Sequence, residues 1–449
     1  MEQTKENKMG TMPVNKLLVT MSLPMVISMI VQALYNIVDS IFVSRLSEDA
    51  LTAVSMAFPM QNLMISVAVG TGVGINAMLS RALGEKKFEA ANKTAENGIF
   101  IEVLGYVLFL LIGIFVTKPF FLAQAGAGDI ANMGIEYTRI CLLMSFGIFM
   151  QIGFERILQS TGRTIFTMIT QSTGAIINII LDPILIFGLF GMPKMGVAGA
   201  AIATVTGQIC AAILAITFNL TKNPDVHISF KGFKPQIIFV KNILSVGIPS
   251  IIMSSVGSAM TFGMNKILIT FSSTAVAVYF KLNSFVFMPV FGLNNGMVPI
   301  VSYNYGAQNK KRLTKTIKLA IMYAVCIMFI GIMLFQFIPD VLLKLFDASD
   351  HMLEIGIPAL RVISLSFAFA GICIVISSSL QALGHGFLSM MISITRQLII
   401  LLPSAYILAK FGGIHAVWWS FNIAEIASLT LSLLFFKHMY NKIIKHLGE

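Results

Sequence analysis

The sequence predicts an all-α membrane protein with twelve transmembrane helices in two pseudo-symmetric six-helix bundles. Three observations support this fold class. Of the 449 residues, 56% are hydrophobic and only 11% are charged, whereas soluble domains carry about 25% charged residues. The apolar residues gather in long runs, and Lys and Arg are concentrated in every second loop between them. A soluble fold could not bury this much apolar surface, and a disordered chain has low hydrophobicity.

Each run is long enough to cross a bilayer core of about 30 Å, which takes about 20 helical residues. In chain order, the predicted spans are 17–44, 50–80, 94–117, 133–160, 164–190, 196–218, 240–270, 275–303, 314–337, 353–381, 387–409 and 414–436. A polar stretch with two prolines follows the sixth span. We therefore expect an N-terminal six-helix lobe at 1–220, a cytoplasmic linker at 221–239 and a C-terminal six-helix lobe at 240–449.

The distribution of basic residues predicts the orientation of the chain. If both termini and the even-numbered loops share one side, that side collects 20 Lys and Arg residues and the other side collects five. Cationic loops are retained in the cytoplasm, so both termini are predicted to be cytoplasmic. The net charge of +11 therefore reflects membrane topology, and it gives no support to a nucleic-acid partner.

The two halves of the chain form a weak internal repeat with an offset of about 222 residues. The string Ser-x-x-x-Gly at 80–84 recurs at 302–306, and Leu-Gln-x-x-Gly at 158–162 recurs at 380–384. The first span of each half also carries a proline, Pro24 and Pro249. Because each half has an even number of spans, the repeat is parallel, and two such bundles are expected to enclose a cleft and to rock for alternating access.

Two acidic residues in the first half lie at matching depth in the membrane. Asp39 lies roughly 9 Å below the outer face and Asp182 roughly 12 Å below it, at about 1.5 Å of rise per residue. Asn178 precedes Asp182 by one helical turn, and Thr204 lies at a similar depth in the sixth span. Oxygen ligands of this kind suit Na⁺, or a proton shared by two carboxylates. The alternative is that these groups only form hydrogen bonds between helices.

The remaining intramembrane charges are candidates for lesser roles. Glu155 lies nearer the cytoplasm and is a candidate for a substrate or proton pathway or for a structural pair; Gln32 and Asn36 are further pathway candidates. Glu102 is interpreted as structural. Arg396 and Glu425 fall near the midplane of neighbouring spans, where a buried structural ion pair is favoured over a functional role.

Several functional classes lack their sequence signatures. The chain has no GxxxxGK[ST] loop, no HExxH and no GxSxG, so neither direct use of ATP nor enzyme activity is expected. The four cysteines lie inside apolar runs without a CxxC motif, which argues against disulfides and a zinc site. A non-transporting receptor would leave the repeat and the intramembrane acids without a role.

These features resemble the family of MATE multidrug and toxic-compound exporters, closest to its DinF-like and MepA-like bacterial branches. The resemblance covers essentially the whole chain. It rests on the repeat, on the two Leu-Gln-x-x-Gly strings, and on the segments 178–188 and 196–204, which are its most specific part. It implies the V-shaped MATE fold with a central cleft.

The resemblance also implies roles for individual residues. It assigns a cation site to the N-terminal lobe, made by Asp39, Asn178, Asp182, Thr204 and the carbonyl of Ala200. By the same resemblance, Pro24 is the point where the first helix can bend, and Glu155 corresponds to an acid of the MepA-like branch. The acids that the NorM-like branch carries in its seventh and tenth helices are missing here.

The function implied is cation-coupled antiport, with H⁺ or Na⁺ as the coupling ion and no cofactor. The chain would export amphipathic or cationic organic compounds across the bacterial cytoplasmic membrane, as a monomer in the lipid bilayer and without a nucleotide. The alternative within the same architecture is a flippase for lipid-linked oligosaccharides or lipids. That function would require a strongly cationic cleft, and the inner-span bases are few.

Overall fold

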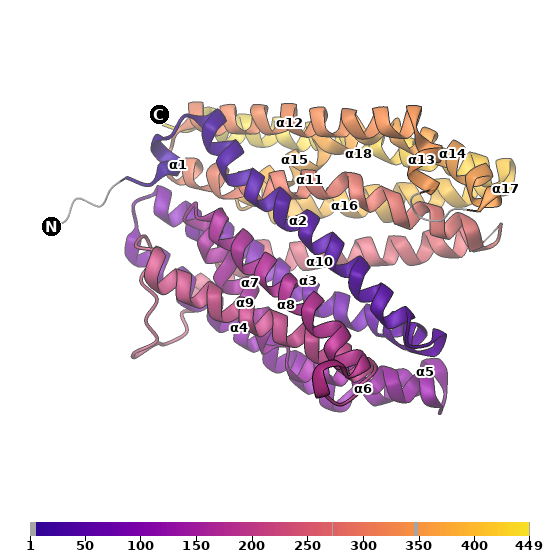
Figure 1. Ribbon diagram of the computed structural model, residues 1–449. Helices are drawn as coiled ribbons and strands as arrows, with labels where there is room; N and C mark the ends of the chain where they lie inside the picture. The colour runs from indigo at the N-terminus through magenta and orange to yellow at the C-terminus, as the bar shows by residue number, and fades with distance from the viewer. Residues whose placement is uncertain (1–5, 272, 345–348, 449) are drawn as a thin grey trace. The chain divides into compact units, whose positions relative to one another are not determined.

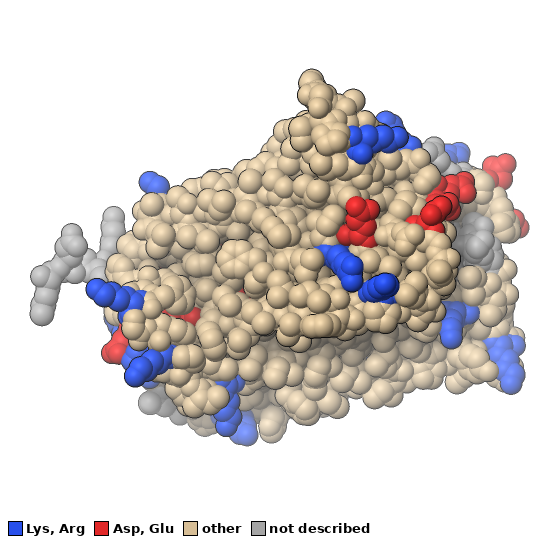
Figure 2. Space-filling model, turned by 90° about the horizontal axis from the view of Figure 1, so that it is seen from below, with Lys and Arg blue, Asp and Glu red and all other residues tan. Residues whose placement is uncertain are grey.

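The computed structural model describes residues 6–271, 273–344 and 349–448, without the side chains of 273–285. Helices and the connections between them, the longest at 223–236, account for all of these residues, and no strand occurs among them (Figure 1). The all-helical fold class is therefore confirmed. On the face drawn in Figure 2, uncharged side chains cover most of the surface, and Lys, Arg, Asp and Glu are few.

The helices follow the predicted spans closely. The first half of the chain holds α1 (Lys8–Thr11), α2 (Val14–Ser44), α3 (Glu48–Gly84), α4 (Phe88–Phe115), α5 (Thr117–Ala125), α6 (Asp129–Leu143), α7 (Phe146–Ser160), α8 (Thr164–Phe187), the 3-10 turn η1 (Leu189–Gly191) and α9 (Val197–Lys222). The second half holds α10 (Ile237–Ile269), α11 (Ser273–Gly306), α12 (Lys310–Phe337), α13 (Pro339–Lys344), α14 (Asp350–Ser364), α15 (Phe367–Ala382), α16 (Gly386–Ile394), the π-helix η2 (Thr395–Leu401), α17 (Leu402–Val417), α18 (Trp419–Lys442) and η3 (Ile444–His446).

Among the described residues, nine helices are long and apolar enough to cross a membrane. The number rises to eleven if α6 with α7, bent by 43°, and α14 with α15, bent by 53°, each count as one span. The span predicted at 275–303 falls on α11, and the side chains of its first part lie outside the described residues. The span predicted at 387–409 is divided among α16, η2 and α17.

Contacts within the chain define two compact units, which are described separately. One unit is Ile27–Ile251, and the other combines Met1–Val26 with Ile252–Glu449. Each boundary lies inside a helix, α2 or α10, two residues after Pro24 or Pro249. The lobe boundaries expected at 220 and 240 remain a prediction.

Within the unit Ile27–Ile251, α3 packs against α4, α6 and α7, and α9 packs against α6, α7 and α8. The helices α8 and α9 approach most closely where two glycines meet. A Cβ atom on Gly207 would lie 2.5 Å from the carbonyl oxygen of Gly174. Such small residues allow close backbone approach between membrane helices. The crossing lies within about one turn of Asn178 and Thr204, and it therefore determines how close these two side chains come.

Within the other unit, α15 packs against α11, α12 and α18. The start of α2 crosses α11 at Gly292 and Gly296. A Cβ atom on Gly296 would lie 2.6 Å from the Cα of Ser22, and the Ser22 hydroxyl donates to the Leu293 carbonyl oxygen at 3.2 Å. The first part of α2 is therefore fixed on α11.

The internal repeat is present in the geometry. The Ser80 hydroxyl donates to the Ser160 carbonyl oxygen at 3.0 Å, and the Ser302 hydroxyl donates to the Ala382 carbonyl oxygen at 2.8 Å. The donor and the acceptor in the second half each lie 222 positions after their counterparts in the first half. The bends between α6 and α7 and between α14 and α15 also correspond, which confirms two pseudo-symmetric halves.

Candidate cation-binding site

Three of the predicted cation ligands meet between α8 and α9. With its amide in the orientation that satisfies its neighbours, the Asn178 Nδ2 donates to Asp182 Oδ2 at 3.0 Å. Its Oδ1 accepts from the backbone N–H of Thr204 at 3.0 Å and from the Thr204 hydroxyl at 3.2 Å. Asn178 and Asp182 share a helix face because they lie four residues apart. The local sequence therefore presents an amide and a carboxylate together to α9.

The fourth predicted ligand, Asp39, comes from α2 and completes the group. Its carboxyl group lies next to that of Asp182, within reach of a hydrogen bond between them. Asp182 is fully buried, and Asp39 is partly exposed. Within the described part of the chain, the Oδ1 atoms of both residues lack a hydrogen-bond partner. Buried polar atoms normally have partners, so the pair has two acceptor oxygens available for a cation or a proton.

Thr204 lies on the α9 side of this group, and the predicted ligand Ala200 lies one turn before it. Both are buried. The region lies over a core that contains Ala50, Ala57 and Val197 and in which Ala200 itself is packed. The small side chains let α9 approach its neighbours, so the hydroxyl of Thr204 is held against Asn178.

Sequence reasoning missed four polar residues around the two acids. Tyr35, one turn before Asp39 on α2, is close enough to interact electrostatically with both Asp39 and Asp182. The Gln61 Nε2 on α3 donates to the Tyr137 Oη on α6 at 3.2 Å and lies 3.6 Å from the Cys141 sulfur. Only Tyr35 had a sequence signal, its four-residue spacing from Asp39. Gln61 and Tyr137 depend on the packing of α3 against α6.

The pathway candidates on α2 precede Asp39 on the same helix. Gln32 and Asn36 are exposed, two turns and one turn before Asp39 respectively. The helix α2 is continuous from Val14 to Ser44 with Pro24 inside it, and the bend expected at Pro24 remains a prediction.

Glu155 belongs to a separate polar cluster. Its carboxylate accepts hydrogen bonds from Thr170 Oγ1 at 2.8 Å, from Gln171 Nε2 at 2.7 Å and from Gln151 Nε2 at 3.0 Å. On α8, Thr170 lies twelve residues before Asp182, a rise of roughly 18 Å. The structure therefore does not bring Glu155 together with Asp39 and Asp182.

The other intramembrane charges have structural neighbours. Glu102 accepts from the Thr71 hydroxyl at 2.7 Å, and the Arg156 Nη1 donates to Gln159 Oε1 at 2.9 Å. The Arg396 Nη1 lies 3.0 Å from Glu425 Oε1, and this confirms the predicted ion pair.

The donor set suits a hard monovalent cation or a proton. The two carboxylates are oxygen ligands of the kind that Na⁺ accepts, and softer metals prefer thiolate or imidazole ligands. Among the described residues, no three His, Cys, Asp or Glu side chains gather as they would for a metal ion of that kind. The group is therefore a candidate site for one small cation, or for one proton shared by two carboxylates.

Comparison with known proteins gives consistent matches over the chain. The profile of the family described as MatE matches residues 24–184 and 246–407. The multidrug export protein MepA of Staphylococcus haemolyticus (strain JCSC1435) is 26% identical over 437 residues, which cover 95% of this chain and 94% of that protein. MepA of Staphylococcus aureus (strain MSSA476) is 29% identical over 422 residues, 92% of this chain and 91% of that protein. A crystal structure of MATE in complex with MaL6 superposes with a TM-score of 0.92 at 27% identity, covering 99% of this chain and all of that one.

Proposed function

The chain belongs to the MatE family of multidrug efflux transporters, and on that premise we propose that it is a cation-coupled antiporter. It exports amphipathic or cationic organic compounds, and H⁺ or Na⁺ drives the export by moving inward. It works as a monomer in the bacterial cytoplasmic membrane with both termini in the cytoplasm. No nucleotide and no cofactor takes part, and we propose no enzyme activity.

One observation carries the proposal: Asp39 and Asp182 are adjacent intramembrane carboxyl groups, each with an oxygen that lacks a protein partner. Charged groups in the hydrocarbon region are costly and are kept where they serve transport. No described Lys or Arg forms an ion pair with either acid. A bound cation or proton would supply the missing compensation.

Binding of the cation changes the charge of the site and hence the packing around it. The site joins α2, α8 and α9, so neutralising the pair changes the electrostatic repulsion between α2 and α8. Export follows if the cation-bound form disfavours the drug-bound state. The two ligands then affect one another only through their different affinities for the two conformations.

The identity of the ion is a separate part of the proposal. The free carboxylate oxygens of Asp39 and Asp182 are hard ligands of the kind that Na⁺ accepts, while the Asn178 oxygen accepts hydrogen bonds from Thr204 and supports the site from one side. The adjacency of two carboxyl groups equally favours a shared proton. Coupling to Na⁺ and coupling to H⁺ therefore predict different driving gradients, and imposing each gradient separately distinguishes them.

The experiment is dye efflux in everted membrane vesicles with the two gradients imposed one at a time. We expect ethidium accumulation in the vesicles to follow either a proton gradient or a Na⁺ gradient. The matched control is the Asp39→Asn/Asp182→Asn variant at the same level of expression. Uptake that needs neither gradient would contradict antiport. A flippase is not proposed, because the named relatives export drugs.

A further inference from the structure

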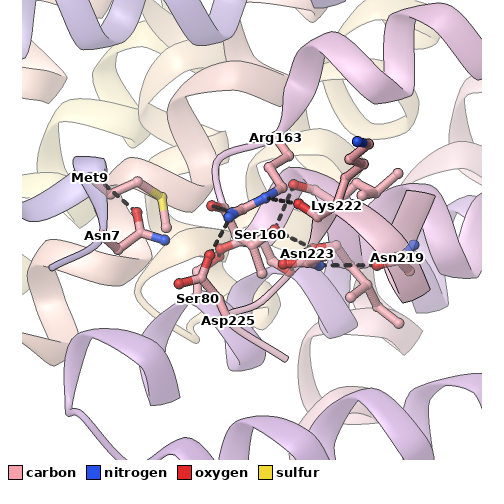
Figure 3. A network of polar contacts seen from close by, with 12 residues as sticks. Asn7, Met9, Ser80, Ser160, Arg163, Asn219, Lys222, Asn223 and Asp225 are labelled. Carbon is pink, nitrogen blue, oxygen red and sulfur yellow. Dashed lines mark hydrogen bonds and ion pairs between the residues drawn. The ribbon is translucent and has the colours of Figure 1, made fainter. Parts of the chain in front are cut away.

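The segment between α9 and α10, residues 223–236, is hydrogen-bonded to helices of its own unit. The Arg163 guanidinium donates to the Lys222 carbonyl oxygen at 2.7 Å and to Asp225 Oδ2 at 2.5 Å (Figure 3). Further along, the backbone N–H groups of 227, 229 and 236 donate to side chains of α4. These acceptors are Asn92, Glu96 and Asn97. The segment therefore has a defined position over the start of α4.

Two phenylalanines of this segment, Phe230 and Phe233, cover one side of an apolar groove. The groove has a volume of about 390 Å³, and its lining comes from α4, α7 and the segment. The residues are Ile99, Phe100, Val103, Phe146, Met150, Phe154, Phe230 and Phe233. Phe233 packs against Phe100 at a ring distance of 5.8 Å and against Phe230 at 5.6 Å. Among the described residues, the lining contains no polar side chain.

The groove runs along the membrane-facing parts of its helices. On α7, Phe154 lies six residues and Phe146 fourteen residues before the end at Ser160, or roughly 9 and 21 Å. On α4, the lining begins at Ile99, after the polar first turns that hold the segment. Phe146 and Phe230 are each 47% exposed, so the groove is open to its surroundings. A slender apolar group can enter it from the bilayer.

The segment that covers the groove carries two lysines. Lys231 and Lys234 flank the covering phenylalanines in sequence, and both are exposed. Neither has an ion-pair partner among the described side chains, and Asp225, the acid of the segment, is paired with Arg163. One acid, Glu96 on α4, lies beside the segment and accepts from the Ser229 N–H at 3.0 Å. The lining itself contains no carboxylate, so the two lysines outnumber the one acid near the groove and favour an anionic head group.

We propose that this groove binds one acyl chain of an anionic phospholipid, with Lys231 and Lys234 contacting its head group. The apolar lining holds the chain by burial, and the lysines select the charge of the lipid. The site is distinct from the Asp39–Asp182 site and does not depend on the proposed function. It binds the lipid to the segment that joins the two halves of the sequence.

The experiment is photo-crosslinking of the reconstituted full-length protein with phosphatidylglycerol that carries a diazirine on one acyl chain. Peptide mapping is expected to find the label on 99–103 and 146–154. The same probe with a phosphatidylcholine head group is expected to label these peptides several-fold less. Equal labelling by the two lipids would overturn the proposal.

Paired variants test the two parts of the site. Lys231→Gln/Lys234→Gln is expected to reduce phosphatidylglycerol labelling by about fivefold for each lysine, because a basic residue near the surface contributes about that factor. The control is Lys437→Gln/Lys442→Gln at the end of α18, which removes the same charge elsewhere. Val103→Trp fills the groove and should abolish labelling, and Val107→Trp adds the same bulk one turn away, where the side chain is 41% exposed.

The lysine variants keep the test decisive if Val103→Trp does not fold, since both lysines are exposed. Unchanged labelling in Lys231→Gln/Lys234→Gln would overturn the head-group contact. Labelling in a folded Val103→Trp at the wild-type level would overturn the groove as the binding site for the chain.

Discussion

Two clusters of buried polar residues in one unit differ in how their carboxylates are satisfied. Glu155 accepts hydrogen bonds at both oxygens from three neutral side chains. Asp39 and Asp182 face one another, and one oxygen of each has no partner in the described structure. An unsatisfied buried oxygen carries a desolvation cost, which two adjacent carboxylates share and which a bound cation or proton would relieve. The comparison therefore identifies the Asp39–Asp182 pair, rather than the Glu155 cluster, as the candidate cation site.

The largest effect is expected from neutralising the unsatisfied pair. In Asp39→Asn/Asp182→Asn, no carboxylate remains to bind the cation, so gradient-driven dye efflux should fall to the level of vesicles without the protein. The protein should still insert and elute as a single species, because the substitutions preserve shape and remove buried charge.

Asp129→Asn is the matched control, since Asp129 is an exposed acid at the start of α6. It should retain wild-type efflux. Wild-type efflux in the double variant would contradict the mechanism, and loss of efflux in the control would show an unspecific response to charge.

The next effect tests how the helix crossing supports the pair. Gly207→Ala adds a Cβ atom that would lie 2.5 Å from the Gly174 carbonyl oxygen, so α8 and α9 must separate. We expect a stability loss of about 1–3 kcal/mol, as for overpacked cores, together with weaker efflux. Thermal unfolding in detergent measures the first, and vesicle uptake the second.

Gly128→Ala serves as the control because no atom lies within 4 Å of the added Cβ. Equal stability of the two glycine variants would show that the close approach of α8 and α9 does not constrain the site.

A comparable loss of stability, but a smaller effect on ion coupling, is expected at the satisfied cluster. In Glu155→Gln, the new amide presents a donor to groups that are themselves donors, at a cost of about 1–3 kcal/mol. Because the cation pair is roughly 18 Å away along α8, coupling to the gradient should persist with a reduced rate. The exposed Glu136→Gln on α6 is the control. Complete loss of coupling would instead place Glu155 on the ion pathway.

Much of this arrangement follows from the sequence. Hydropathy predicted the spans, because a membrane helix must keep its hydrogen bonds internal and its surface apolar. Depth along the helix brought Asp39 to the level of Asp182, and a four-residue spacing joined Asn178 to Asp182. These properties depend on the spacing of residues within one helix, and that spacing is given directly by the sequence.

The rest depends on contacts between helices that spacing does not encode. Gln61 meets Tyr137 because α3 packs against α6, and Glu155 is satisfied by α8 side chains that lie after it in sequence. Phe230 and Phe233 cover the apolar groove because side chains of α4 accept hydrogen bonds from the backbone of the segment at 223–236. The bends of 43° and 53° occur in apolar stretches without a proline at the break, so hydropathy shows each of them as one span.

The smallest effect is expected where both halves of the repeat make the same contact. Ser80→Ala and Ser302→Ala each remove one hydroxyl that donates to a carbonyl oxygen, at 3.0 and 2.8 Å. Each should lower stability by about 1 kcal/mol, the usual net value of one hydrogen bond, and leave efflux intact. A contact present in both halves serves the fold that they share, whereas the Asp39–Asp182 pair occurs in one half alone. Thermal unfolding of the two variants side by side checks this, and an efflux defect in only one of them would show that the two contacts have diverged in function.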